Sequence, residues 1–320
     1  MLQRIRSLTM VAVLALIVAP AAAQYPNKPI RLIIPFPAAG AADLSARVLA
    51  VPLSQALGQP VIVENRPGAD GAIAADIVIK AAPDGYTLFY GTNTALCSVP
   101  AMRKNPPYNP VTDFTPISLV GTFGFFLFVH PSVPAQSVAE LLVYARANPG
   151  KLNYATGNST SLLATARLKM LERIDMVEVP YKGDAPATLD LVAGRVHLMI
   201  ATPGTAAAFV KEGKLRALVA LQPTRSSLLP EVPTYLEAGL PPLAITPWAG
   251  LFGPAKMPKE VVDRLARDTA AVVARPEVRE QLERYAFDGR SSTPEELGAF
   301  LKEQVDVWIR TTREVGIVPD

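Results

Sequence analysis

The segment formed by residues 30–57, IRLIIPFPAAGAADLSARVLAVPLSQAL, decides the fold of this chain. It opens on the apolar run 30–36, which predicts a buried strand, and continues through the small residues 38–42. From Asp43 onward apolar residues recur at helical spacing, and Gly58 stands where such a helix would stop. The segment therefore predicts a buried strand that runs through a tight turn into a helix.

Strands and helices are predicted to alternate in both halves of the chain. Strands are predicted over 60–64 and 86–90, with a helix over 72–81 between them. Strands and helices that alternate with short connections predict parallel strands joined by right-handed crossovers. A second α/β series is predicted from 138 to 221, and three closing helices are predicted over 259–274, 277–285 and 294–315.

Two apolar segments, 123–129 and 248–253, are candidates for crossings between two halves of an α/β fold. We therefore expect one lobe to contain residues 24–124 and 248–320, and a second lobe to contain residues 125–247. The chain is long enough for two compact domains.

The first 23 residues have the layout of a secretory signal peptide. Arg4 and Arg6 precede the apolar run 8–18, and Ala21-Ala22-Ala23 follows Pro20 with small residues suited to cleavage. We expect cleavage after Ala23 and a soluble, periplasmic protein. A retained membrane helix is the alternative, and the shortness of the apolar run argues against it.

Charge and reactive residues exclude several classes of function. The chain has 31 basic and 28 acidic residues, and removal of the leader leaves 29 basic against 28 acidic residues. A near-neutral chain lacks the basic footprint expected for nucleic-acid binding. Cys97 is the single cysteine, so no internal disulfide can form, and we expect its thiol to be buried.

The sequence also lacks the patterns of catalytic and cofactor sites. His130 and His197 are isolated, which gives no metal-type spacing. Phosphate-binding glycine motifs are absent, and Ser159 and Ser161 have no evident base partner. We therefore predict no catalytic residues, no metal site and no cofactor.

Two turns of small residues are the candidate binding elements. Residues 36–43 and 154–161 each lead a strand into a helix. Unpaired amides at a helix start, together with the helix dipole, favour negative charge. If the turns face each other across a cleft, they form a two-sided clamp for an anion such as a carboxylate. The alternative is that each turn is only a tight connection.

Short motifs extend this picture along the whole chain. They are YPNKPI at 25–30, FPAAG at 36–40 with Asp43 and Arg47 behind it, VENRPGA at 63–69, AAPDGYTL at 81–88, YNPV at 108–111, DFTP at 113–116, PGKLNY at 149–154, VPYKG at 179–183 with APA at 185–187, GKLRAL at 213–218 and LPEVPT at 229–234. With these motifs the chain resembles the extracytoplasmic substrate-binding proteins of tripartite tricarboxylate transporters, the Bug proteins, from about Tyr25 to the C-terminus.

The resemblance implies a type II periplasmic binding protein fold, with two α/β lobes, an interlobe ligand cleft and two crossings. It implies closure around a ligand that carries a carboxylate, held by backbone amides and ordered water. We expect a monomer without enzymatic activity. The implied partners are the membrane subunits of such a transporter. A protein that signals to a sensor kinase, and a secreted enzyme on the same fold, are the alternatives.

The predicted ligand-binding residues cluster around the two turns and the strand ends beside them. They are Phe36, Ala38, Ala39, Gly40, Ala41, Asp43, Thr92, Asn93, Thr156, Gly157, Asn158, Ser159, Thr160, Tyr181 and Ala201. Core packing is an alternative for the two aromatic residues, and a role as helix cap is an alternative for Asp43. Arg47 is expected to face away from the helix start, and Lys182 to be a solvated surface charge.

Departures from the family pattern bear on the ligand. Ala39 stands where the family has glycine, so a positive φ there would be strained. Ala201-Thr202 replaces a frequent acidic pair, and His197 replaces a frequent Asp. Loss of an acidic residue near the cleft would remove a partner for a ligand ammonium. This disfavours amino acids and mildly favours a plain mono- or dicarboxylate.

Overall fold

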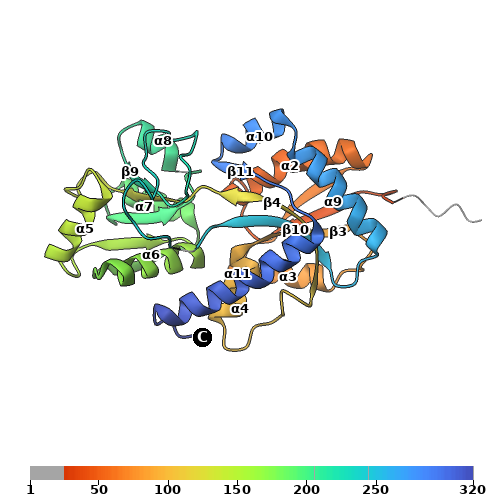
Figure 1. Cartoon of the computed structure of the whole chain (residues 1–320), viewed down its shortest axis with the longest axis horizontal. Coiled ribbons are helices and arrows are strands. Elements are labelled where there is room, and N and C mark those ends of the chain that lie inside the picture. The colour runs from red at the N-terminus through yellow and green to blue at the C-terminus, as the bar shows by residue number, and fades with distance from the viewer. Residues whose placement is uncertain (1–24, 205, 244, 320) are drawn as a thin grey trace, which may run out of the picture.

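Two α/β units lie side by side in the computed structural model, which describes residues 25–204, 206–243 and 245–319 (Figure 1). Each unit is built on one sheet. The predicted signal peptide lies outside the described residues. Among the helices of the described residues, none is both long enough and apolar enough to cross a membrane.

The first sheet has six strands in the order β11-β4-β10-β3-β1-β2. These strands are β1 (Ile30–Ile34), β2 (Val61–Asn65), β3 (Thr87–Thr92), β4 (Phe114–Phe123), β10 (Trp248–Pro254) and β11 (Phe287–Gly289). The predicted parallel pairing is confirmed, because β1 pairs in parallel with both β2 and β3. The sheet is mixed, since β10 runs antiparallel to β3 and β4.

Helices cover both faces of the first sheet. They are α2 (Ala41–Leu57), α3 (Ala72–Ile79), the short α4 (Val99–Met102), α9 (Lys259–Val273), α10 (Pro276–Glu283) and α11 (Pro294–Glu314), with short η1 (Ala69–Gly71) and η2 (Thr94–Ser98) turns. Side chains alternate across a strand, so Leu32 packs in the cluster of Leu53 and Leu265, while Ile33 packs in the cluster of Trp308. This alternation places α2 and α9 on one face and α11 on the other.

The second sheet has the strand order β7-β6-β8-β5-β9. Its elements are β5 (Phe126–Val129), α5 (Val138–Ala147), β6 (Asn153–Thr156), α6 (Ser159–Glu172), β7 (Val177–Pro180), α7 (Asp184–Val192), β8 (Leu198–Ala201), α8 (Ala206–Lys211) and β9 (Arg216–Ala220). Strand β6 is parallel to β7 and β8, whereas β5 is antiparallel to β8 and β9. The predicted α/β fold class, with two sheets, is confirmed.

The first crossing differs from its prediction. The predicted single strand 123–129 is two strands, because β4 ends at Phe123 in the first sheet and β5 begins at Phe126 in the second. An apolar run predicts burial but does not indicate where the chain passes from one sheet to the other. The sequence alone therefore did not predict the break between β4 and β5. The two crossings run side by side, since the Phe123 amide donates to the Pro247 carbonyl at 2.8 Å.

The composition of the two sheets supports the proposed lobes, 24–124 with 248–320 and 125–247. All strands of the first sheet come from 30–123 and 248–289, and all strands of the second come from 126–220. We propose that these two sets of residues are the two lobes.

The last helix also touches both units. Helix α11 packs against the first sheet, and its far end reaches α6 of the second unit (Figure 1). There the Arg167 guanidinium forms an ion pair with Glu314 at 2.6 Å and donates to the Thr311 hydroxyl at 3.3 Å. The units are therefore also linked by side chains at the far end of α11, away from the two crossings.

Candidate functional site

The carboxyl ends of strands from the two sheets meet at a polar contact. Asn93, directly after β3, donates from Nδ2 to Oγ1 of Thr160 at 2.9 Å, and Thr94 Oγ1 lies 3.0 Å from the same oxygen. Thr160 belongs to the first turn of α6, which follows β6. Open α/β sheets bind ligands at the carboxyl ends of their strands. The structure thus brings two predicted site residues, Asn93 and Thr160, into contact at such an edge.

The first turn, between β1 and α2, is exposed and leaves its helix start open. Residues 37–39 are solvent-exposed, and α2 begins at Ala41 with Gly40 as its N-cap. Gly40 makes no side-chain cap, so the first amides of this 17-residue helix remain free of one. A Cβ added at Gly40 would meet only the Pro37 carbonyl oxygen, at 3.5 Å. The backbone beside Gly40 therefore has room for an approaching group.

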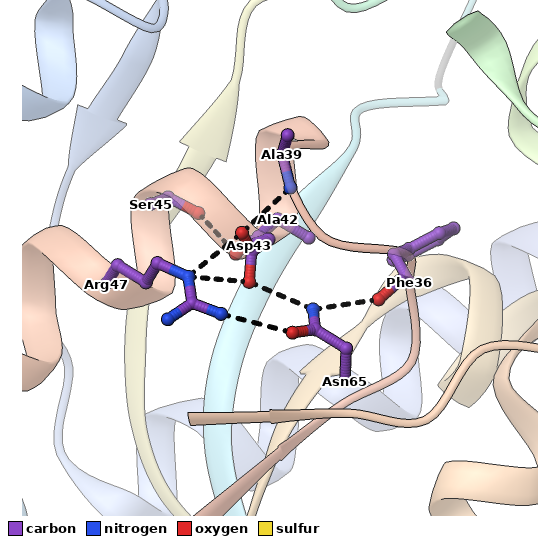
Figure 2. A network of polar contacts seen from close by, with 7 residues as sticks. All are labelled: Phe36, Ala39, Ala42, Asp43, Ser45, Arg47 and Asn65. Carbon is purple, nitrogen blue, oxygen red and sulfur yellow. Dashed lines mark hydrogen bonds and ion pairs between the residues drawn. The ribbon is translucent and has the colours of Figure 1, made fainter. Parts of the chain in front are cut away.

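Asp43 orders this turn from the inside (Figure 2). The helix begins two residues earlier than predicted, and Asp43 lies buried in its first turn. Its carboxylate accepts the Ala39 amide at 2.9 Å, the Arg47 Nε at 3.0 Å and the Asn65 Nδ2 at 2.9 Å. Asn65 also donates to the Phe36 carbonyl at 3.0 Å. The carboxylate is thus occupied by protein donors on both oxygens.

These partners set the charge of Asp43. Burial acts to raise the pKa of the carboxyl group, but hydrogen bonds from Arg47, the Ala39 amide and Asn65, with the charge of Arg47, outweigh it, and the pKa is lowered. Asp43 therefore stays ionised, with its charge balanced by Arg47.

The prediction that Arg47 faces away from the helix start is wrong. Four residues along a helix turn the side chain through a full turn and about 40° more, which returns it to the same face. Arg47 accordingly lies over Asp43 and also donates from Nη2 to the Asn65 Oδ1 at 3.2 Å (Figure 2).

Ala39 adopts the positive φ that we expected to be strained at this position. Its φ is +64°, in the left-handed region that glycine adopts freely. For an L-residue this conformation costs about 1–2 kcal/mol. The bond from its amide to Asp43 offsets part of that cost and fixes the shape of the turn.

The second turn, between β6 and α6, is buried and capped. Asn158 is the N-cap, and its Oδ1 accepts the amides of Thr160 at 3.0 Å and Ser161 at 3.1 Å. The Thr156 hydroxyl donates to Glu178 Oε1 at 2.7 Å. These groups already have protein partners, so Asn158 and Thr156 shape the turn, and the Thr160 amide is not free for a ligand.

Three hydroxyls beside the meeting point have no partner. Within the described residues, Thr92 Oγ1, Ser159 Oγ and Ser161 Oγ are buried without a hydrogen bond. Thr92 is 2% exposed and Ser159 is 7% exposed, and each is next in sequence to a residue of the Asn93–Thr160 contact. A buried unpaired hydroxyl is costly and calls for a water or ligand partner. Both sides of the contact between Asn93 and Thr160 therefore have hydroxyl groups that lack a hydrogen-bond partner.

The remaining predicted site residues have other surroundings. The Tyr181 hydroxyl donates to Asp190 Oδ2 at 2.8 Å, and Ala201 is buried in the core of the second unit. Phe36 is half-buried against the core of the first unit. Their backbones stay at the carboxyl edges of the sheets, but their side chains contact protein.

Asp184 is a residue of this edge that sequence reasoning missed. It begins α7, and its Oδ1 accepts Nδ2 of Asn158 at 2.9 Å. The Thr202 side chain, just after β8, hydrogen-bonds the same carboxyl group. A Cβ added at Gly157 would overlap Asp184 Oδ1, so the two residues are in close contact. The sequence signal was available, because Asp184 directly follows the VPYKG motif in the position of a helix start.

Burial raises the pKa of Asp184 to about 6, although hydrogen bonds from Asn158 and Thr202 act to lower it. No cation is among the causes of the shift. The second turn thus carries an acidic group that is poorly compensated, whereas the acidic group of the first turn is paired with Arg47.

Other reactive groups are accounted for by packing. Cys97 is fully buried, as predicted, and burial raises the pKa of its thiol. In the described part of the chain, no group of three or more His, Cys, Asp or Glu side chains is placed to hold a metal ion.

Comparison with known proteins agrees with this architecture. Residues 45–317 match the family described as "Tripartite tricarboxylate transporter family receptor". A relative from Pseudomonas sp. strain P51, named for the tcbD-tcbE intergenic region, is 37% identical over 89% of this chain and 85% of its own length.

Two solved structures are similar along nearly their whole length. The R. palustris protein Rpa4515, solved with adipate, is 31% identical with a TM-score of 0.86, and covers 92% of this chain and 100% of that one. MatC from Rhodopseudomonas palustris, solved with bound malate, is 29% identical with a TM-score of 0.79, and covers 90% of this chain and 99% of that one.

The two sheets, their meeting carboxyl edges and these matches define a solute-binding protein of the periplasmic binding protein fold. The chain belongs to the tripartite tricarboxylate transporter receptor family, as its sequence motifs indicated. Members of this family are receptors of a transport system, and the protein is a binding protein rather than an enzyme.

Proposed function

We propose that this protein is exported to the periplasm, captures a small carboxylate between its two lobes and delivers it to the membrane subunits of a tripartite tricarboxylate-type transporter. The observation that supports this most directly is the meeting of two carboxyl edges at Asn93 and Thr160, with unpaired buried hydroxyls on both sides. The family assignment supports the transport partner.

Backbone geometry supports the choice of a carboxylate. The exposed first turn presents the uncapped amides of α2, and the dipole of that helix favours an anion. Relatives solved with adipate and malate have ligands of this class. We infer that the ligand carboxylate lies against residues 38–42, and that Thr92, Ser159 and Ser161 supply hydroxyl groups from the sides.

A thermal-shift screen tests this function. The protein is unfolded and refolded to remove carried-over ligand, and then heated with a panel of small mono- and dicarboxylates, sugars and metal cations. A ligand at a hundredfold excess over its dissociation constant adds about 2.7 kcal/mol to the free energy of unfolding. We expect carboxylates alone to raise the melting temperature. Stabilisation by sugars or cations with no response to any carboxylate would refute the proposal.

Export has a separate test. N-terminal sequencing of protein from the periplasmic fraction should begin at Gln24, and an intact Met1 on membrane-bound material would contradict cleavage after Ala23. Signalling to a sensor kinase remains the alternative to delivery. If the protein delivers its ligand, deletion of the membrane subunits should abolish uptake of that ligand. If the protein only signals, the same deletion should leave uptake unchanged.

A further inference from the structure

Asp184 stands at the centre of the second turn's polar surface. Its carboxyl group lies between Asn158, which follows β6, and Thr202, which follows β8. Strands β6, β7 and β8 run parallel, so the loops after them share one edge of the second sheet. This is the edge that meets the first unit through Thr160. Asp184 is thus placed by three strand ends at the proposed ligand site.

Neutral donors are the partners that the structure gives Asp184. Asn158 contributes an amide and Thr202 a hydroxyl, and among the described residues no Lys, Arg or His forms an ion pair with this carboxylate. The neighbouring Lys182 is exposed and makes no such pair. A partly buried carboxylate without a cation attracts any donor that approaches and repels a second carboxylate.

A second feature of the same turn points to a ligand. The Ser159 hydroxyl, one residue from Asn158, is 93% buried and unpartnered, since the residue is only 7% exposed. A role as a helix-dipole partner for α7 would explain an acidic residue at the start of that helix. It would not account for the unpaired Ser159 hydroxyl, which lacks a hydrogen-bond partner that a ligand or a water molecule could supply.

The first turn has the opposite character. Asp43 is neutralised by Arg47 and faces the protein, while the amides at the start of α2 lack a side-chain cap. A carboxylate is favoured there and disfavoured beside Asp184. A ligand that spans both turns is therefore expected to differ at its two ends.

We propose that Asp184 is a specificity-determining residue that selects a monocarboxylate bearing a hydrogen-bond donor, an ammonium or a hydroxyl group, at the end opposite its carboxylate. This rests on the proposed function and narrows it. The loss of acidic residues at Ala201-Thr202, which argued against amino acids, is compensated by an acid from α7.

Calorimetry with ligands matched in length tests the inference. The probes are hexanoate, 6-hydroxyhexanoate, 6-aminohexanoate and adipate, with the corresponding four- and five-carbon sets, each titrated into refolded full-length protein at pH 7.5. We expect the best amino or hydroxy ligand to bind at least tenfold more tightly than the dicarboxylate of equal length. Asp184→Asn should reduce this ratio to about threefold or less, mainly by improving dicarboxylate binding.

Two further variants make the result decisive. Asp184→Ser removes the charge with a smaller side chain and should change the ratio in the same direction if Asp184→Asn folds poorly. Glu140→Gln removes an acidic residue from the first turn of α5, remote from the edge, and should leave the ratio unchanged. Equal loss of affinity for every probe in the Asp184 variants would mean a purely structural role and overturn the inference.

A dicarboxylate preference in the unaltered protein would also overturn it, while leaving the proposed function intact. Binding of none of the carboxylates would instead refute the proposed function itself. The two failures are therefore distinguishable within one experiment.

Discussion

The two helix-opening turns are both built of small residues, yet they differ in physical character. The first, at 38–42, is exposed at Ala38 and Ala39, has no side-chain cap and is ordered by an ionised Asp43 paired with Arg47. The second, at 156–160, is buried, capped by Asn158 and adjoins a poorly compensated Asp184. Small residues permit a tight turn, but partners from elsewhere in the chain decide whether the turn presents donors or acceptors.

The largest effect should come from filling the second turn. In Gly157→Val the new Cβ would overlap Asp184 Oδ1 and lie 2.7 Å from the Asp184 amide nitrogen. Because backbone must then move, we expect a loss of about 3 kcal/mol in the free energy of unfolding, together with loss of ligand binding. Urea unfolding followed by circular dichroism measures this, and unchanged stability would show that the turn is loosely packed.

Removal of the hydrogen bonds that Asp43 accepts in the first turn should have the next largest effect on the free energy of unfolding. Asp43→Ala leaves the Ala39 amide, Arg47 and Asn65 without their shared acceptor, and should cost about 2 kcal/mol in the free energy of unfolding. The matched control is Asp76→Ala, which breaks the exposed pair with Lys80 at the same four-residue spacing. It should cost less than about 0.5 kcal/mol. Equal losses in the two variants would contradict the bracing role.

The acidic groups of the two turns should also respond differently to pH. The pKa of Asp184 in the folded protein, about 6, lies above its usual value, so the native state loses stability as pH rises through about 4 to 6. Asp184→Asn should remove this loss and gain about 2 kcal/mol at pH 7.5 relative to its effect at pH 4. Urea titrations at both pH values measure it.

The pH dependence contributed by Asp43 has the opposite sign. Because the pKa of Asp43 is lowered, its ionised carboxylate contributes stability above the usual pKa of an Asp, and this stability is lost as the pH falls.

An Asp184→Asn variant with the same pH dependence as the unaltered protein would contradict the raised pKa of Asp184.

Filling the first turn should spare the fold and affect binding alone. Gly40 has φ −77° and ψ 166°, which valine adopts readily, and the added Cβ would make only an ordinary contact with the Pro37 carbonyl oxygen, at 3.5 Å. We expect Gly40→Val to weaken carboxylate binding about tenfold, or about 1.4 kcal/mol, with unchanged melting temperature. The carboxylate affinity of Gly40→Ala should lie between those of Gly40→Val and the unaltered protein. Full affinity in both variants would mean that no ligand approaches this backbone.

The smallest effect is expected for Lys182→Ala. Lys182 is exposed, so its removal should change carboxylate affinity by less than about 1 kcal/mol in calorimetry. A dominant effect of Lys182, with Gly40 tolerant, would show that a side-chain cation and not the backbone holds the carboxylate.

Local patterns in the sequence were sufficient to predict most of the architecture. The buried strand at β1, its parallel neighbours and the helices after them follow from periodicity, which depends on nearby residues. Strand β4 and the three-residue β11 were missed. A proline at 116 and glycine at 121 obscure the strand pattern of β4, and β11 is too short to show a period.

The helical turn η2 was also missed, because π-helical geometry has no simple sequence period.

The candidate site was predictable in place but not in detail. Both turns were located by their small residues before a helix. The roles of Asn158 as cap and of Arg47 as partner of Asp43 depend on side-chain directions. Asp184 joins the second turn through a contact 26 residues distant in sequence, which no local pattern reports.

The paired crossings have a mechanical consequence for the whole molecule. Two backbone segments held together by the bond from Phe123 to Pro247 resist twisting better than one, yet both can flex in the same direction. On the side of α11, the ion pair between Arg167 and Glu314 is half exposed at its carboxylate and should yield at little cost. A movement that separates the two units has to break this ion pair and the buried hydrogen bond between Asn93 and Thr160, while the paired crossings keep the units connected.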